Sequence, residues 1–252
     1  MLRSEWTKLR SVRSTPLSLL AAFAVAVAGG LFSATGRAHD YPTWSAAEKA
    51  AFDPVNLSFD GLAFAQLAFA VVGVLAISSE YTTGQIRTTF TVVPRRRSVL
   101  AAKVLVLGGV ALVVGELLSL VSFLVAQLGL RSIHLNVSLG DGSALRAVAG
   151  AGIYLVALTL LGLGLGAIIR HTAGAVSTVF GLVFVVPLVA ANLSGWVSWP
   201  SKWNLWAAGN ALISTQPPAD GAPSPALGLL ICAVYALVPL TVAAVLTSRR
   251  DV

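Results

Sequence analysis

Six long apolar runs alternate with polar segments along the chain of 252 residues, and this pattern predicts six membrane-spanning helices. A bilayer needs about 20 mainly apolar residues in a helix, and the runs approach or exceed that length. The spans are expected at residues 17–35, 60–78, 98–128, 146–169, 172–192 and 226–247. The pattern therefore indicates an all-α polytopic membrane protein with a single transmembrane domain over residues 1–252.

Residues 1–14, which precede the first span, have an apolar pattern of their own. Four apolar side chains follow at spacings of four, three and three: Leu2, Trp6, Leu9 and Val12. Three basic residues fall largely outside this face: Arg3, Lys8 and Arg10. We therefore expect an amphipathic helix on the membrane surface, anchored by Trp6. A cleaved signal peptide is the competing interpretation, but a retained first helix is the simpler account because several spans follow.

A polar and basic segment, residues 79–97, joins the second and third spans. A serine at 78 or 79 can cap a helix that begins at Glu80, and Pro94 is a typical stop signal. The basic run that follows, Arg95, Arg96 and Arg97, would meet phosphate headgroups at the start of the third span. From charge alone, a positive loop that only fixes the topology accounts for the segment equally well.

A second polar segment, residues 194–215, precedes the last span and is rich in tryptophan. Four indoles recur at three, four and three residues: Trp196, Trp199, Trp203 and Trp206. Pro200 interrupts a single helix, so we expect a short helix from near Pro200 to about Ile213. It would lie at the outer interface or dip back into the membrane, because indole prefers the headgroup level. A plain interfacial belt without a role in transport is the alternative.

Composition and charge narrow the class further. Hydrophobic residues make up 56% of the chain and charged residues only 11%, which does not suit a soluble domain. With the N-terminus inside, twelve of the 17 Lys and Arg residues face the cytoplasm. The remaining five lie outside: Arg37, Lys49, Arg131, Arg146 and Lys202. This asymmetry predicts two cytoplasmic termini and accounts for the net charge of +7 without nucleic acid.

Two charged side chains fall inside predicted spans. Lys103, near the start of the third span, is expected to reach back to the cytoplasmic headgroups. Glu116 lies deeper in the same span, where a carboxylate must be protonated, paired or hydrated. It could line a substrate path, meet a polar group on another helix or hold a proton. Since no basic residue is clearly placed at its depth, a structural or cavity-lining role is favoured over a proton relay.

The sequence lacks the motifs typical of ATP hydrolysis, metal binding and disulfide formation. It has no G-x-x-x-x-G-K-[ST] phosphate-binding loop, so the chain is not expected to hydrolyse ATP by itself. Its three histidines, His39, His134 and His171, fall in loops or at span ends and indicate no catalytic or metal centre. Cys232 is the only cysteine, which rules out a disulfide within the chain.

The opening SEWTKLRSVRSTP, the six spans and above all EYTTGQIRTTFTVVPRRRSVLAAK resemble the permease subunits of type-2 ABC exporters. The likeness is to compact bacterial forms made separately from their ATPase. It implies an N-terminal connecting helix, with Glu5, Trp6 and Lys8, beside a coupling helix that docks on the ATPase. The implied coupling residues are Glu80, Tyr81, Gly84, Gln85, Arg87, Arg95, Arg96 and Arg97.

The resemblance also implies a working unit of two permease chains, identical or related, and two ATPase subunits that bind ATP and Mg. The unit would sit in the bacterial cytoplasmic membrane and export an amphipathic drug, peptide or lipid-like compound. Two alternatives stay open. One is a secondary transporter or channel that works alone and uses Glu116 as its ion-sensitive group. The other is a membrane component of a sensing or immunity complex that binds a peptide without moving it.

Overall fold

The computed structural model describes residues 2–11, 14–86, 96–193, 202–218 and 221–249. All regular elements in these ranges are helices, and six of them are long and apolar enough to cross a membrane. The six candidate spans are Thr15–Thr43, Leu62–Thr82, Arg97–Ile133, Gly142–Ile169, Thr172–Asn192 and Pro225–Thr247. The all-α, six-span architecture expected from the apolar runs is therefore confirmed.

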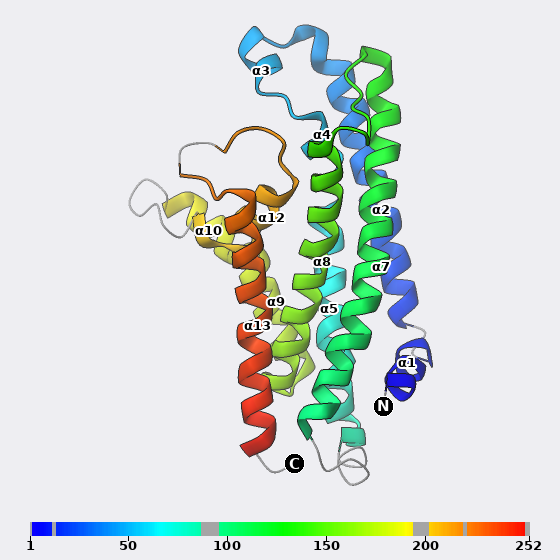
Figure 1. Ribbon diagram of the computed structural model, residues 1–252, viewed down its shortest axis with the longest axis vertical. Coiled ribbons are helices and arrows are strands. Elements are labelled where there is room, and N and C mark those ends of the chain that lie inside the picture. The colour runs from blue at the N-terminus through cyan, green and yellow to red at the C-terminus, as the bar shows by residue number, and fades with distance from the viewer. Residues whose placement is uncertain (1, 12–13, 87–95, 194–201, 219–220, 250–252) are drawn as a thin grey trace.

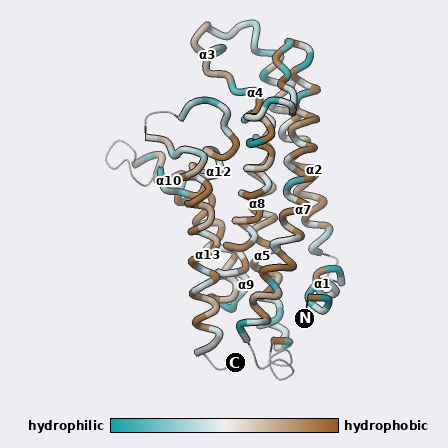
Figure 2. Tube along the Cα trace, in the orientation of Figure 1, coloured by the Kyte–Doolittle hydropathy of each residue, from teal (hydrophilic) through white to brown (hydrophobic). Residues whose placement is uncertain are grey.

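The helices form an elongated bundle with α8 (Gly142–Ile169) at its centre (Figure 1). Three other long helices pack along α8: α5 (Leu62–Thr82), α7 (Arg96–Leu130) and α13 (Pro225–Arg249). The first span, α2 (Ser14–Asp40), packs against α7 and α5. Figure 2 shows that apolar residues dominate the long helices and polar residues gather at the two ends of the bundle.

Both ends of the described chain lie at one end of the bundle, the lower end in Figure 1. This lower end holds α1 (Leu2–Ser11), the last turn of α5, the start of α7 and the end of α13. The opposite, upper end holds four short elements: η1 (Tyr41–Thr43), α3 (Ala46–Ala50), α4 (Pro54–Leu57) and η2 (Arg131–Ile133).

The fifth span is not one regular helix. It runs as α9 (Thr172–Phe180), a π-helical turn labelled η3 (Gly181–Val185) and α10 (Val186–Leu193). The irregular turn directly precedes Pro187, which has no backbone N–H to complete the regular ladder.

A short helix, α12 (Leu205–Ile213), lies between the fifth and sixth spans. The Asn204 side chain caps its start by accepting a hydrogen bond from the Ala207 amide at 2.8 Å. The helix packs against α13 and α8 while Trp203 and Trp206 remain about half exposed. Residues 202–203 are also helical, and a bend at Asn204 separates them from α12, whereas Trp196 and Trp199 lie outside the described residues.

Glycines on α8 let two neighbouring helices approach its backbone. A Cβ atom built on Gly162 would lie 2.0 Å from the carbonyl oxygen of Ala70 on α5. On another side, a Cβ on Gly164 would lie 2.7 Å from the Pro239 side chain of α13. These close helix contacts set the spacing at the centre of the bundle.

We expect Gly162→Ala to lower the free energy of unfolding in mild detergent by about 1–3 kcal/mol or more, because α5 must move away. Gly36→Ala is the matched control, since a Cβ there meets nothing within 4 Å and alanine favours the helix. Equal stability of the two variants would contradict the packing described here.

Candidate functional site

Four charged side chains from three separate segments meet at the lower end of the bundle. Glu5 and Lys8 are one turn apart on α1, Glu80 lies in the last turn of α5, and Lys103 lies two turns into α7. We call these four residues the charge cluster. It joins an N-terminal helix to the two spans that flank residues 83–95.

Lys103 is the centre of the charge cluster. Its Nζ donates to Glu5 Oε2 at 2.6 Å, to Glu80 Oε1 at 2.7 Å and to the Ala76 carbonyl at 3.2 Å. Lys103 and Glu80 are each only 4% exposed, so the pairing takes place largely away from water. The expectation that Lys103 reaches the headgroups is wrong, because two carboxylates satisfy it inside the protein.

Lys8 completes the cluster from its more exposed side. Its Nζ lies 2.9 Å from Glu5 Oε1 and 2.9 Å from Glu80 Oε1. Two carboxylates therefore share two ammonium groups, and the charges balance. A buried arrangement of this kind is stable only when each charge is paired and hydrogen-bonded.

Burial and pairing act in opposite directions on the α1 members. Burial alone would raise the pKa of Glu5, but hydrogen bonds from Lys103 and Lys8 outweigh it and hold that pKa below its usual value of 4.5. Burial alone would lower the pKa of Lys8, but Glu80 and Glu5 raise it above 10.5. The Glu5 contribution to stability is therefore complete above pH 4.5 and lost as the pH falls below it, whereas the Lys8 contribution is lost above pH 10.5.

Beside the cluster, α5 also contacts the junction between α8 and α9. The Arg170 guanidinium lies 5.0 Å from the centre of the Tyr81 ring, in a cation–π contact. Arg170 ends α8 with a positive φ of 58°, which turns the chain sharply towards α9. One turn earlier on α5, Ser78 Oγ accepts a hydrogen bond from the Thr172 hydroxyl at 2.9 Å. The end of α5 is thus tied to three other parts of the bundle.

The α5 helix continues through Thr82, so the prediction of a new helix beginning at Glu80 is wrong. Ser78 and Ser79 lie inside α5 and do not cap a helix start: the Ser78 hydroxyl accepts from Thr172, and the Ser79 hydroxyl donates to the Leu75 carbonyl. The helix ends at Gly84, whose φ of +70° is a conformation that glycine adopts without strain. Gln85 then lines a cavity of about 180 Å³ beside the cluster.

The structure brings together only some of the predicted site residues. Glu5, Lys8 and Glu80 meet directly, with Tyr81 alongside, whereas Trp6 points away from the cluster and is 53% exposed. Arg87 and Arg95 lie outside the described residues, as does the Arg96 side chain, and Arg97 is exposed at the start of α7.

Glu116 is far from the cluster, in the middle part of α7, and is partly buried. Its carboxylate lies against the backbone of α8, where a Cβ on Gly152 would come within 2.3 Å of it. Within the described part of the chain, no basic side chain pairs with this carboxylate. Gly152 therefore makes room for the Glu116 side chain. The structural or cavity-lining role of Glu116 stays a prediction.

A second polar cluster, which the sequence did not indicate, closes the upper end. The Asp53 carboxylate caps α4 by accepting from the amides of Val55 and Asn56 at 3.0 and 2.9 Å. It also accepts from the Thr215 amide at 2.7 Å and the Thr215 hydroxyl at 2.8 Å. One carboxylate thus joins the loop before the second span to the segment that follows α12, and we call this contact the Asp53 clamp.

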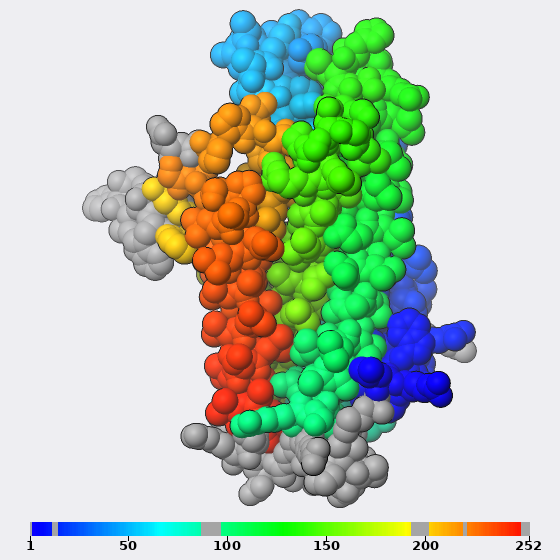
Figure 3. Space-filling model, in the orientation of Figure 1, coloured from blue at the N-terminus to red at the C-terminus, as the bar shows by residue number. Residues whose placement is uncertain are grey.

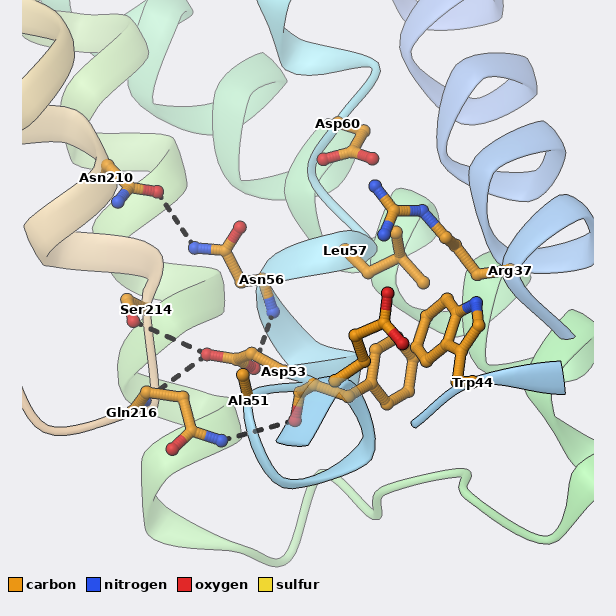
Figure 4. Close-up of a pocket in the computed structure, with 12 residues that line it drawn as sticks. Arg37, Trp44, Ala51, Asp53, Asn56, Leu57, Asp60, Asn210, Ser214 and Gln216 are labelled. Carbon is orange, nitrogen blue, oxygen red and sulfur yellow. Dashed lines mark hydrogen bonds between the residues drawn. The ribbon is translucent and has the colours of Figure 1, made fainter. Parts of the chain in front are cut away.

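A cavity of about 570 Å³ lies beside the Asp53 clamp (Figure 4). Figure 4 shows Asp53, Asn56, Asn210 and Gln216 on one side and Arg37, Asp60 and Trp44 on the other. The Asn56 amide donates to Asn210 Oδ1 at 2.9 Å, and the Arg37 guanidinium lies 5.7 Å from the Trp44 ring centre. Contacts within the protein therefore occupy much of the polar lining.

The missed residues had only weak signals in the sequence. Lys103 could have been paired by noting that Glu5 and Glu80 are almost the only acidic residues on the strongly basic side of the membrane. Arg170 had no such signal, since its partner is a ring far away in the sequence, and no sequence signal indicated the contact of Asp53 with Thr215, which is 162 residues away.

The fold is that of a polytopic membrane protein with six candidate spans. A sequence profile described as ABC-2 family transporter protein matches residues 1–188, from the N-terminus into the fifth span. The chain therefore belongs to the ABC-2 transporter family, which confirms the resemblance to type-2 ABC permeases. No curated protein matches the chain.

We expect Lys103→Met to lower the free energy of unfolding in mild detergent by about 3–5 kcal/mol, because it leaves two buried carboxylates with Lys8 alone. Lys8→Met should cost less than Lys103→Met, because the Lys8 side chain is 27% exposed and water can replace part of the pairing that it supplies, whereas Lys103 is buried. Denaturant titration of both variants measures the difference. Equal losses would show that Lys103 is not the centre of the cluster.

Proposed function

We propose that this chain is the permease subunit of an ATP-driven exporter, and that the charge cluster couples it to a separate ATPase. Membership of the ABC-2 family supports a membrane transport role and association with an ABC ATPase. The chain itself has no phosphate-binding loop, so ATP and Mg would bind to the partner.

The observation that carries the proposal is the linkage of α1, α5 and α7 through Lys103. In the sequence, residues 83–95 join α5 to α7, and the side chains on either side of them, Glu80 and Lys103, are joined to each other and to Glu5 of α1 by ion pairs. A force on that segment would reach α1 through the ion pairs and α8 and α9 through the Tyr81–Arg170 contact. The cluster would therefore make these elements move as one unit when the ATPase closes.

The direction of the chain in the membrane follows from charge. The lower end carries the basic residues of α1 and of the start of α7, and the positive-inside rule assigns it to the cytoplasm. In this proposed orientation the end of α5 and the start of α7, which residues 83–95 join, would face the ATPase, and the Asp53 clamp and α12 would lie outside. An export direction and an amphipathic drug, peptide or lipid-like substrate belong to the same proposal.

A stand-alone transporter that uses Glu116 is the second candidate function. The half-buried carboxylate of Glu116, with no basic partner among the described residues, is the observation that favours it. Family membership favours the first candidate, because ABC-2 permeases are components of ATP-dependent systems.

Purification of the tagged chain from its host in mild detergent separates the two functions. We expect a stoichiometric soluble subunit with a phosphate-binding loop, identified by mass spectrometry. A chain that comes out alone and mediates flux in liposomes without ATP would overturn the coupling proposal. Loss of that flux in Glu116→Gln, under a proton gradient, would then support the second candidate.

Gly84 offers a sharper test of coupling in the purified complex. Gly84→Val should uncouple ATP hydrolysis from transport, since a β-branched residue at φ +70° stores about 1–3 kcal/mol of strain and redirects residues 85–95. Gly84→Asn is the matched control because asparagine tolerates this conformation and a Cβ there meets nothing within 4 Å. ATPase and transport rates are measured together. Normal transport by Gly84→Val would count against a coupling role for this turn.

A further inference from the structure

Two apolar grooves lie on either side of Trp6, where α1 crosses the base of the bundle. The first, of about 610 Å³, lies between α1 and α7 and is lined by Leu2, Val110 and Val113. The second, of about 400 Å³, faces α2 and is lined by Leu9, Leu19 and Phe23. Figure 3 shows α1 against the lower part of α7, which is the outer side of this region. The Trp6 side chain lines both grooves.

Each groove has one arginine in its lining. Arg3 lines the α7 groove and Arg10 lines the α2 groove, and both side chains are exposed. Among the described residues, neither guanidinium forms an ion pair or a side-chain hydrogen bond. The one acidic residue of α1, Glu5, is already neutralised by Lys103 and Lys8. Each groove therefore combines an apolar surface with an unneutralised positive charge.

This combination matches the chemistry of a phospholipid with an anionic headgroup. The apolar lining suits an acyl chain, and a guanidinium binds phosphate oxygens in a fork geometry. Leu20, which lines the α2 groove, is 65% exposed and offers further apolar surface to a lipid chain. An acidic soluble peptide would satisfy the arginines but leave the apolar lining uncovered.

We propose that the grooves beside Trp6 bind anionic phospholipids of the cytoplasmic leaflet, with acyl chains against Trp6 and phosphates at Arg3 and Arg10. The leaflet rests on the orientation proposed above. Bound lipid would hold α1 against α7 from the outside, while the charge cluster holds it from the inside. The two contacts together would fix α1 in the position that the ion pairs require.

The test is native mass spectrometry of the full chain, with any copurified ATPase, titrated with phosphatidylglycerol or with phosphatidylcholine. We expect preferential retention of phosphatidylglycerol, weakened about fivefold by Arg3→Gln and again by Arg10→Gln. Arg131→Gln is the matched control, because this exposed arginine lies at the other end of α7.

Gly109→Leu tests the groove itself. Gly109 lines the α7 groove and a Cβ there meets nothing within 4 Å, so leucine fills the groove without disturbing the bundle. We expect it to abolish retention of one lipid, while Gly36→Leu, an equally open helical position, retains both. Monodisperse elution of each variant confirms that it folds.

Equal retention of the two lipids, or unchanged binding in the arginine variants, would overturn the proposal. Unchanged binding in Gly109→Leu would also overturn it, since headgroups would then bind to the surface charge alone. The ATPase recovered in the same preparation keeps the two proposals separate. If the ATPase copurifies but lipid is not retained, only the proposal of lipid sites is refuted. If lipid is retained but no ATPase copurifies, only the proposed function is refuted.

Discussion

The free energy needed to remove an ammonium group from water is the constraint on which the lower end of this protein depends. Lys103 is buried in a span, and such a charge is tolerated only when carboxylates and carbonyls replace its hydration. The chain supplies those groups from α1 and from the end of α5. The burial of Lys103 therefore requires α1 to be docked, because Glu5 supplies one of the groups that replace its hydration.

The two ends of the bundle stabilise their charged side chains in different ways. The lower end uses four formal charges that neutralise one another, whereas the upper end uses one carboxylate, Asp53, surrounded by amides and hydroxyls. Between them, the centre relies on backbone contact at glycines such as Gly162. Rigid polar ties at both ends and close helix packing in the middle suit a bundle that moves as a whole.

The sequence was sufficient for the spans, since apolar runs of this length seldom occur outside membrane-spanning helices, and for the amphipathic character of α1. It also singled out Glu5, Lys8 and Glu80, although through resemblance and not through their pairing. Lys103 was misplaced because a lysine near a span end has two stable positions, headgroup or ion pair, and only the tertiary structure selects one. The clamp formed by Asp53 was missed because its Thr215 partner lies 162 residues away and contributes a backbone amide, which carries no sequence signature.

The long separation between Asp53 and Thr215 has a consequence for biosynthesis. During translation the loop before the second span emerges first, and Asp53 can then do no more than cap α4. Its second set of donors exists only after five spans and α12 have been made. Insertion of the early spans and closure of the upper end of the bundle are therefore separate events, and a ribosome that stalls before α12 leaves a chain in which the Asp53 clamp has not formed.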